Sequence, residues 1–410
     1  MTAQIVFYIL IGIVILNYLK EEVLSYFNAK HFNDMLPSEL RDVYDEKEYL
    51  KSQSYKKTNY HFSLYTNTFS ILLTVSFFFF KGFAAVDTIV RNTTDNEILQ
   101  TLLYFGILLL GSDLLTTPFS YYKTFVIEEK FGFNKSSKKL FFLDKIKGWA
   151  VSILLGGLIL ALITWFYQQT GNSFWIFTWA LIAFFSLVMN LFYSSLIVPL
   201  FNKQTPLEEG ELKNKLEEFA VHIGFHLDKI YVIDGSKRST KANAYFSGFG
   251  PKKRIVLYDT LINDLTNDEI VAVFAHEVGH YKRKHTLFNL IMSTLLTGLT
   301  LFILSLLIGS PLLSKALNVS IPCFHIGLIA FSILYSPISE LTGLIMNAIS
   351  RAFEYQADNF AKTHTNAEAL ISSLKKLSKN SLSNLTPHKA TVFAHYSHPT
   401  LLERIHNLRK

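Results

Sequence analysis

Seven long apolar stretches constrain this 410-residue chain more than any other feature. A helix needs about 20 apolar residues to cross the hydrocarbon core of a bilayer. Stretches of this kind occupy residues 3–19, 62–86, 98–119, 148–168, 173–200, 286–309 and 322–347. The sequence therefore predicts a mainly α-helical, multi-pass integral membrane protein with seven transmembrane helices.

The composition agrees with a membrane protein. Half of the residues are apolar and only 17% are charged, less than in ordinary soluble domains. Lysine and arginine of membrane proteins collect in cytoplasmic loops, so the net charge of +7 does not require nucleic acid, and we expect none as a partner. Cys323 is the single cysteine, which excludes an intramolecular disulfide and argues against a cysteine-based zinc site.

The charge of the loops predicts how the chain is oriented. Loops after the first, third and fifth stretches are rich in lysine and arginine. The second has only Arg91, the fourth has none and the sixth has only Lys315. The positive-inside rule then places the N-terminus outside and the C-terminus in the cytoplasm. The expected membrane is that of the endoplasmic reticulum in a eukaryote, or the inner (plasma) membrane in a bacterium.

Two water-facing parts are expected to fold. We divide the chain into helices one to five with their loops (1–200), a cytoplasmic core (201–285), helices six and seven (286–347) and a helical C-terminal part (348–410). A helical pattern at 209–224 opens the core, and strand-like runs follow at 229–233, 243–246 and 254–258.

A motif typical of metal-dependent hydrolases lies at the end of this core. Thr266 and Glu269 form a capping box that starts a helix, and His276 and His280 lie one turn apart on it. Both imidazoles can therefore reach one metal ion, and Glu277 can approach a metal-bound water as a general base. Catalytic zinc sites take three protein ligands and leave one position open, so we predict one Zn²⁺ per chain. The alternative is a capped amphipathic helix with two surface histidines.

The third ligand is expected from the segment after the last apolar stretch. Glu354 lies there, on the predicted cytoplasmic side, and Asp358 follows one helical turn later. A carboxylate in that place can accept the free N–H of a ligating histidine. The alternative is a helix turn with ordinary solvated acids.

With these residues in place, the chain resembles the type I CAAX prenyl proteases, membrane zinc metalloendopeptidases of the gluzincin kind. The resemblance covers nearly the whole chain. Besides the histidine helix and residues 351–358, it includes 49–55 (YLKSQSY), 125–134 (FVIEEKFGFN), 199–203 (PLFNK), 243–248 (NAYFSG) and 396–400 (YSHPT).

This resemblance implies a barrel of seven helices around a hydrated chamber, with a gluzincin-like zinc domain and a small β-sheet on the cytoplasmic side. It implies removal of the last three residues of prenylated CAAX proteins, with Glu354 as the third zinc ligand. Asn243, Ala244 and Tyr245 would pair with the substrate backbone as an edge strand. His398 would lie near the metal and stabilise the oxyanion; the alternative is a histidine that caps a helix before Pro399.

Our leading hypothesis is a zinc metalloendopeptidase, a hydrolase whose partners are the lipid bilayer and a peptide or prenylated protein substrate. A general quality-control protease without a prenyl requirement is the closest alternative. A transporter with a structural zinc would instead use polar residues within the spans, for which Asp113, Asn190 and Glu340 are candidates. A membrane scaffold is a further alternative, although it has no need of the four metal-site residues.

Overall fold

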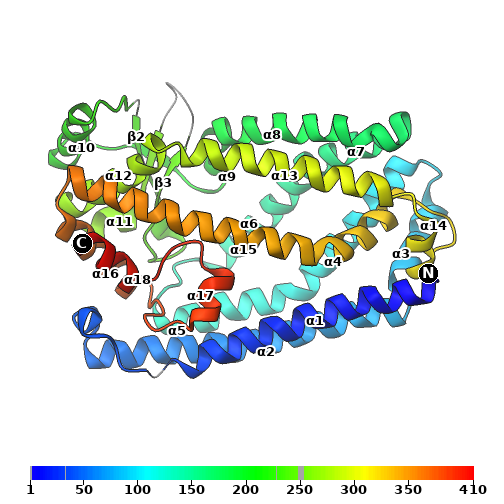
Figure 1. The fold of residues 1–410 in the computed structure, drawn as a ribbon, viewed down its shortest axis with the longest axis horizontal. Coiled ribbons are helices and arrows are strands. Elements are labelled where there is room, and N and C mark those ends of the chain that lie inside the picture. The colour runs from blue at the N-terminus through cyan, green and yellow to red at the C-terminus, as the bar shows by residue number, and fades with distance from the viewer. Residues whose placement is uncertain (1, 33, 228, 248–253) are drawn as a thin grey trace.

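The computed structural model describes residues 2–32, 34–227, 229–247 and 254–410, with the backbone alone for Phe246 and Ser247. Gly248, which closes the motif at 243–248, lies outside the described residues. Long helices run side by side through the molecule, and a small sheet with several shorter helices gathers at one end, where the C-terminus also lies (Figure 1). The N-terminus lies at the opposite end.

Most of the chain is helical, as predicted. The long helices are α1 (Ala3–Lys30), α2 (Glu46–Phe79), α4 (Glu97–Tyr122), α7 (Gly157–Thr170), α8 (Phe174–Leu196), α13 (His285–Leu307) and α15 (Phe324–His364). The shorter ones are α3 (Gly82–Thr93), α5 (Glu129–Phe131), α6 (Lys138–Val151), α9 (Val198–Phe201), α10 (Glu211–His222), α11 (Asp259–Asp264), α12 (Asn267–Lys282), α14 (Pro311–Ala316), α16 (Ala367–Asn380), α17 (Lys389–His395) and α18 (Leu401–Arg409). Single turns of 3₁₀ helix lie at Ser38–Leu40, Gly171–Ser173 and Gly235–Lys237, and π-helical turns at Lys123–Glu128 and Ser152–Gly156.

Six helical segments of the described chain are long and apolar enough to cross a membrane. They are Ala3–Lys30, Glu46–Phe79, Glu97–Phe131, Lys138–Phe201, His285–Leu307 and Phe324–His364. The fourth has 64 residues and would be about 96 Å long if it were straight, far more than a bilayer needs. It contains two of the predicted stretches, 148–168 and 173–200, and the chain turns between them at Gly171, whose φ is +53°. The multi-pass architecture is thus confirmed, while the count of seven crossings stays a prediction.

The helix of the second predicted crossing has other ends than the apolar stretch at 62–86. This helix, α2, begins at Glu46 rather than near residue 62, because Asp45 and Glu48 form a capping box well before the apolar residues start. It ends at Phe79, since Lys81 takes a left-handed conformation with φ 56° and a separate helix, α3, follows. A hydropathy profile does not reveal where a helix is interrupted inside an apolar run.

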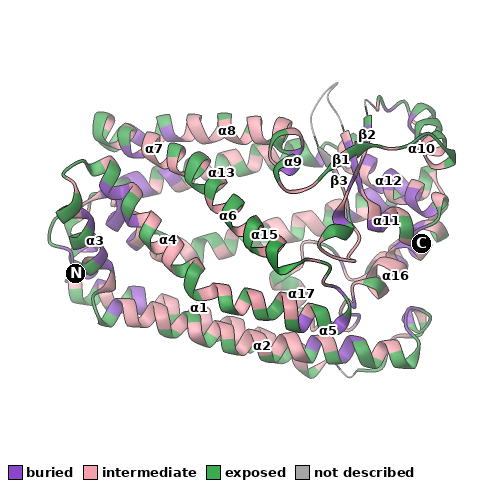
Figure 2. Cartoon of the chain, turned by 180° about the vertical axis from the view of Figure 1, so that it is seen from behind, coloured by how far each residue is buried: buried purple, intermediate pink, exposed green. Residues whose placement is uncertain are grey.

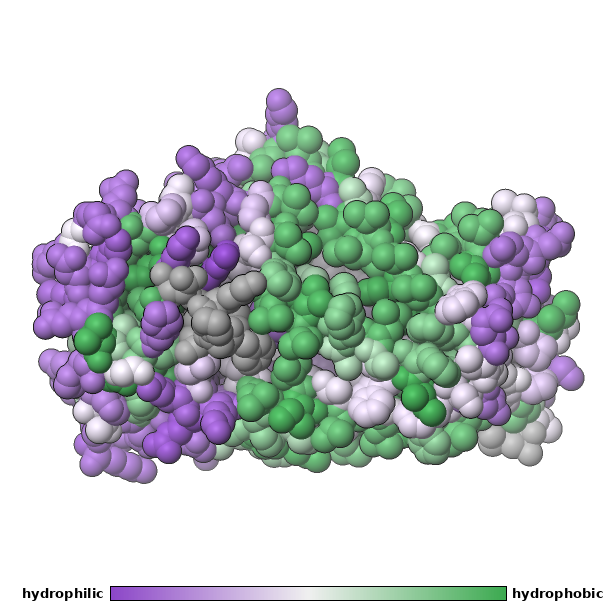
Figure 3. Space-filling model, turned by 90° about the horizontal axis from the view of Figure 1, so that it is seen from above, coloured by the Kyte–Doolittle hydropathy of each residue, from purple (hydrophilic) through white to green (hydrophobic). Residues whose placement is uncertain are grey.

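Apolar side chains cover the sides of the long helices. Seen from above, a broad hydrophobic region occupies the middle of the molecule, while hydrophilic residues gather mainly at its ends, most densely at the end with the sheet (Figure 3). Buried residues are concentrated at the two ends, and the long helices between them carry mostly intermediate and exposed residues (Figure 2). This distribution fits a protein whose middle faces lipid.

The sheet has four strands in the order β1-β2-β4-β3, with bounds Gln204–Pro206 (β1), Lys229–Ile233 (β2), Ala244–Ser247 (β3) and Arg254–Tyr258 (β4). β2 and β4 are parallel, and the two outer strands are antiparallel to their neighbours. Two strands match the predicted ranges, and β3 is shifted by one residue. β1 was not predicted, because this strand has only three residues and ends in proline. β3 lies at an edge of the sheet.

Helix α12 crosses the core of this end and packs against α10, α15 and α16. Its capping box is present: the Thr266 hydroxyl accepts from the Glu269 N–H, and the Glu269 carboxylate accepts from the Thr266 N–H at 2.8 Å. Glu269 also accepts hydrogen bonds from Ser372 and Lys376 on α16. The predicted helix start is therefore confirmed, and α16 fixes it further.

Candidate metal centre

His276 and His280 point from α12 to the same place. Their Nε2 atoms lie 3.2 Å apart, as one helical turn allows. His276 is buried and His280 is partly exposed. The alternative of two ordinary surface histidines does not fit this placement.

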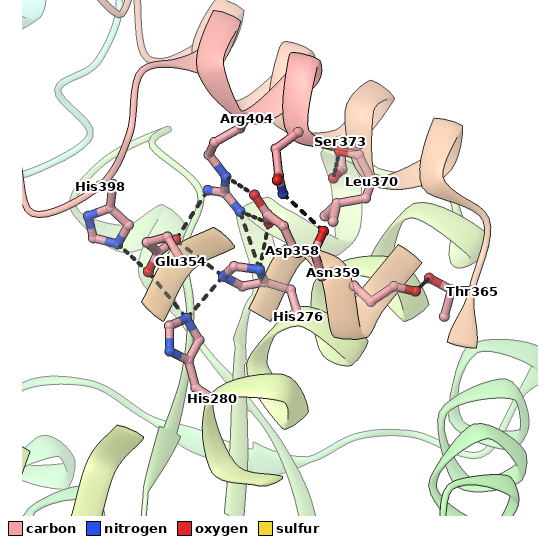
Figure 4. Close-up of polar contacts among 12 residues, drawn as sticks. His276, His280, Glu354, Asp358, Asn359, Thr365, Leu370, Ser373, His398 and Arg404 are labelled. Atoms are coloured by element: carbon pink, nitrogen blue, oxygen red, sulfur yellow. Dashed lines mark hydrogen bonds and ion pairs between the residues drawn. The ribbon is translucent and has the colours of Figure 1, made fainter. Parts of the chain in front are cut away.

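Glu354 on α15 meets both histidines (Figure 4). Its Oε2 lies 3.4 Å from His276 Nε2, and its Oε1 lies 3.2 Å from His280 Nε2. Ligands bound to zinc at 2.0–2.1 Å in a tetrahedron are about 3.3 Å apart, so the three side chains fit one ion. Within the described residues the buried Oε2 atom of Glu354 accepts no hydrogen bond. A bound metal ion would give this atom the partner that buried polar atoms need.

Asp358 orients the first histidine. Its Oδ1 lies 2.9 Å from His276 Nδ1 and its side chain is fully buried, as the one-turn spacing from Glu354 led us to expect. An N–H at Nδ1 that donates to this carboxylate leaves the Nε2 lone pair free for a metal.

Arg404 on α18 was missed in the sequence. Its guanidinium donates to both oxygens of Asp358, at 2.9 and 2.5 Å, and its Nη1 lies 3.5 Å from Glu354 Oε2. A buried carboxylate needs such a partner, but nothing in the spacing shows which of the many basic residues supplies it.

His285 was also missed, although it lies only five residues beyond His280. The two Nδ1 atoms are 3.0 Å apart, and His285 Nε2 lies 3.2 Å from the Gln356 amide oxygen. If His280 Nε2 faces the metal, its Nδ1–H donates to His285 Nδ1, and His285 Nε2–H donates to Gln356. The His285 ring is also stacked on Phe353 at 4.0 Å. Each ligand histidine therefore has a partner that fixes its tautomer.

The electrostatics of His276 favour proton uptake when no metal is bound. Burial and the nearby Arg404 cation lower its pKa, but the Asp358 and Glu354 carboxylates outweigh them and raise the pKa to about 9. A ligating imidazole must be neutral, so protons and a metal ion compete for this side chain.

The cluster faces a cavity of about 1150 Å³. Glu277 lines it, and within the described chain its carboxylate forms no hydrogen bond or ion pair. The cavity extends to Asn190 and Tyr193 on α8 and to Asn289 on α13. It thus connects the predicted metal site with helices that are apolar enough to lie in the membrane.

His398 lies at the mouth of the site. Its Nε2 is 3.3 Å from Glu354 Oε1, and its side chain is 63% exposed, so it can move toward a bound molecule. The cap of the following helix, α18, is Thr400, so His398 does not cap it.

The predicted substrate strand borders the same cavity. Asn243, Ala244 and Tyr245 all line it, with the last two on the edge strand β3. The polar residues considered for a transport path are more dispersed. Asp113 pairs with Lys145 on α6, and Glu340 pairs with Lys20 on α1.

Comparisons with known proteins cover nearly the whole chain. A family model described as the CAAX prenyl protease N-terminal, five membrane helices, matches residues 25–203, and the model of peptidase family M48 matches residues 206–410. The chain is 39% identical to CAAX prenyl protease 1 homolog of Arabidopsis thaliana, with 90% of this chain and 89% of that one covered. It is 35% identical to CAAX prenyl protease 1 of Saccharomyces cerevisiae, with 97% and 94% covered. The crystal structure of S. mikatae Ste24p superposes with a TM-score of 0.93 at 33% identity, covering 99% of each chain.

Proposed function

Because the chain belongs to peptidase family M48, we propose that this multi-pass membrane metalloprotease uses zinc to remove the last three residues of prenylated CAAX-type proteins or to cleave related membrane-associated peptides. The observation that carries the proposal is the convergence of His276, His280 and Glu354, with ligand atoms 3.2–3.4 Å apart, on a cavity that Glu277 also lines. The CAAX substrate is taken from the named relatives.

In this proposal His276, His280 and Glu354 would hold one Zn²⁺, which would supply Lewis acidity for the scissile carbonyl and for water. Glu277 takes a proton from the attacking water and later gives it to the leaving amine. Its carboxylate forms no hydrogen bond within the described chain and interacts with Arg404 only through charge, which suits a group that must bind and release a proton.

His398 would stabilise the negative charge that develops on the carbonyl oxygen. Its proximity to Glu354 and its exposure support this role. Asp358 and Arg404 would act indirectly, by holding His276 and Glu354 in place. Asp358 does not line the cavity, and Arg404, which borders it, directs its guanidinium at Asp358 and Glu354.

The peptide would add to β3 as a further antiparallel strand, alongside Asn243, Ala244 and Tyr245. β3 is the last strand in the sheet order, so within the described strands only β4 pairs with it. An apolar chain on the substrate would extend from the site toward α8 and α13, where the cavity continues. The active site would face the cytoplasm, as the loop charges predict.

Replacement of Glu277 by glutamine tests the mechanism. We expect the purified variant to keep its zinc and to lose at least about 100-fold in kcat/KM, since general base catalysis contributes roughly that much or more. Glu218→Gln on α10 is the matched control, because this carboxylate is exposed and far in sequence from the site. Cleavage by Glu277→Gln at the wild-type rate with normal zinc content would exclude the role given to Glu277.

A second experiment separates CAAX processing from general quality control. The same peptide is offered with and without a farnesyl group on its cysteine. CAAX processing predicts a much higher kcat/KM for the farnesylated form, whereas equal values would favour a protease without a prenyl requirement. Absence of any cleavage, before and after metal loading, would favour a transporter or scaffold.

A further inference from the structure

A second group of potential metal ligands lies at the opposite end of the helices. Asp87 on α3, Cys323 at the start of α15 and His325 on α15 come together there. His325 and Glu354 belong to one helix and are 29 residues apart, which corresponds to about 44 Å along its axis. This group is therefore independent of the candidate catalytic centre.

The three ligand atoms form a closed triangle. Asp87 Oδ1 lies 2.8 Å from His325 Nε2, Cys323 Sγ lies 3.3 Å from His325 Nε2, and Cys323 Sγ lies 3.7 Å from Asp87 Oδ1. For zinc bonds of 2.0–2.1 Å to nitrogen or oxygen and 2.3 Å to sulfur, tetrahedral geometry gives separations of about 3.3–3.6 Å. Both distances to sulfur are within a few tenths of an ångström of these values. The shorter oxygen–nitrogen distance is that of a hydrogen bond and requires a small outward movement.

The surroundings hold the triangle in place. Asp87 and His325 are buried, among the apolar residues of α1, α3, α4 and α14 that form the core of this end. Arg91 donates to the second oxygen of Asp87 at 2.8 Å, which leaves Oδ1 directed at the other two residues. The Tyr104 ring packs on the His325 ring at 4.5 Å. Ligands of metal sites commonly receive support of this kind from a surrounding shell.

A buried polar atom beside the triangle has no partner. Tyr104 is fully buried, and its hydroxyl forms no hydrogen bond within the described residues. The hydroxyl interacts electrostatically with both Asp87 and Cys323, so it lies beside the triangle. Arg91 also interacts with Cys323 as well as with Asp87, so its cation borders the same space. Three protein ligands leave the fourth position of a tetrahedral ion for water, and such a water could donate to the Tyr104 hydroxyl.

We propose that Asp87, Cys323 and His325 form a second metal site, for Zn²⁺, that ties α3 to the start of α15. Thiolate, imidazole and carboxylate are the three ligand types that zinc takes in proteins. Binding releases the thiol proton of Cys323. The thiolate and the Asp87 carboxylate then face the ion, while Arg91 stays paired with the second oxygen of that carboxylate. In the sequence, the presence of a single cysteine argued against a cysteine-based zinc site. The fold brings His325 and Asp87 to Cys323, and no pattern in the sequence predicts that contact.

Cobalt substitution tests the proposal directly. The candidate catalytic centre contains no sulfur, and the chain has one cysteine, so a thiolate-to-cobalt charge-transfer absorption can arise only at Cys323. The full-length protein is stripped with a chelator under reducing conditions and titrated with Co²⁺. We expect the absorption in the wild type and in His276→Ala/His280→Ala, and its loss in Cys323→Ser.

Zinc content provides the second measurement, on protein purified without chelator. We expect two zinc ions per wild-type chain, one in His276→Ala/His280→Ala and one in Cys323→Ser. Asp95→Asn, an exposed carboxylate at the same end, is the control and should retain two. The proposal is overturned if the wild type binds a single zinc that the double histidine variant lacks and if no thiolate absorption appears with Co²⁺. Asp87, His325 and Cys323 would then be a hydrogen-bonded cluster only, and the proposed peptidase function would be unaffected.

Discussion

Gly279, between the two histidines of α12, allows this helix to approach α15 closely enough to complete the metal site. A methyl group added at Gly279 would lie 3.0 Å from the Ala357 Cα atom and 3.1 Å from its carbonyl oxygen. Ordinary contacts of a Cβ atom are 3.4–4 Å, so the two helices must separate by about 0.4 Å or more. Ala357 lies between Glu354 and Asp358 in α15. The separation therefore moves both carboxylates away from their histidines.

We expect Gly279→Ala to lower metal affinity by about 10–100-fold, the usual effect of disturbing groups that position metal ligands. Overpacking should also cost about 1–3 kcal/mol of stability, reduced by the better helix propensity of alanine. The assays are competitive zinc titration, thermal unfolding and peptide cleavage at saturating zinc. Gly343→Ala is the matched control on α15, because nothing lies within 4 Å of a methyl group there. Wild-type zinc affinity in Gly279→Ala would refute the argument that this contact sets the ligand geometry.

Three further substitutions test the support of the site. His285→Ala should weaken zinc binding by about 10–100-fold, because His280 loses the acceptor that fixes its tautomer; competitive titration measures this, and unchanged affinity would show that the histidine pair is incidental. Arg404→Met should lower the free energy of unfolding by about 3–5 kcal/mol, since it leaves the buried Asp358 carboxylate without its cation. Thermal unfolding measures this loss of stability. A decrease in Tm no larger than that of a variant at an exposed arginine would contradict the prediction. Glu269→Gln should lower stability by about 1–2 kcal/mol at neutral pH through loss of charged hydrogen bonds to α16. Burial raises the pKa of Glu269, but Lys376, Ser372 and the Thr266 N–H lower it more. The stability that ionised Glu269 contributes is therefore complete above the usual glutamate pKa of about 4.3 and is lost as the pH falls through the lowered pKa. The difference in stability between Glu269→Gln and the wild type should accordingly shrink in acid.

The parts of the fold that follow from local pattern were predicted well. Helical membrane segments, the parallel strands at 229–233 and 254–258 and the capped start of α12 depend on hydropathy, alternation and capping residues that are adjacent in the chain. Predictions failed where a short element or a break carries little local signal. β1 has three residues, and the break at Lys81 lies inside an apolar run.

The candidate site divides in the same way. His276, Glu277 and His280 are positioned by one helical turn, and Glu354 and Asp358 by another, so their spacing alone predicted the groups that meet. Arg404 and His285 could not be assigned, because their roles depend on which helices pack together. Asp87, Cys323 and His325 are the extreme case, because the aspartate and the histidine that it contacts are 238 positions apart in the sequence.

The sequence by itself determined that this chain crosses a membrane, and it predicted the metal-site residues His276, His280 and Glu354, since both rest on side-chain chemistry and on periods of a few residues. Only the tertiary structure decided that α12 and α15 approach closely at Gly279 and that an arginine and a third histidine complete the site. It also brought the lone cysteine to an aspartate and a histidine. Contacts of this kind are fixed by the packing of distant helices, for which a single sequence holds no local signal.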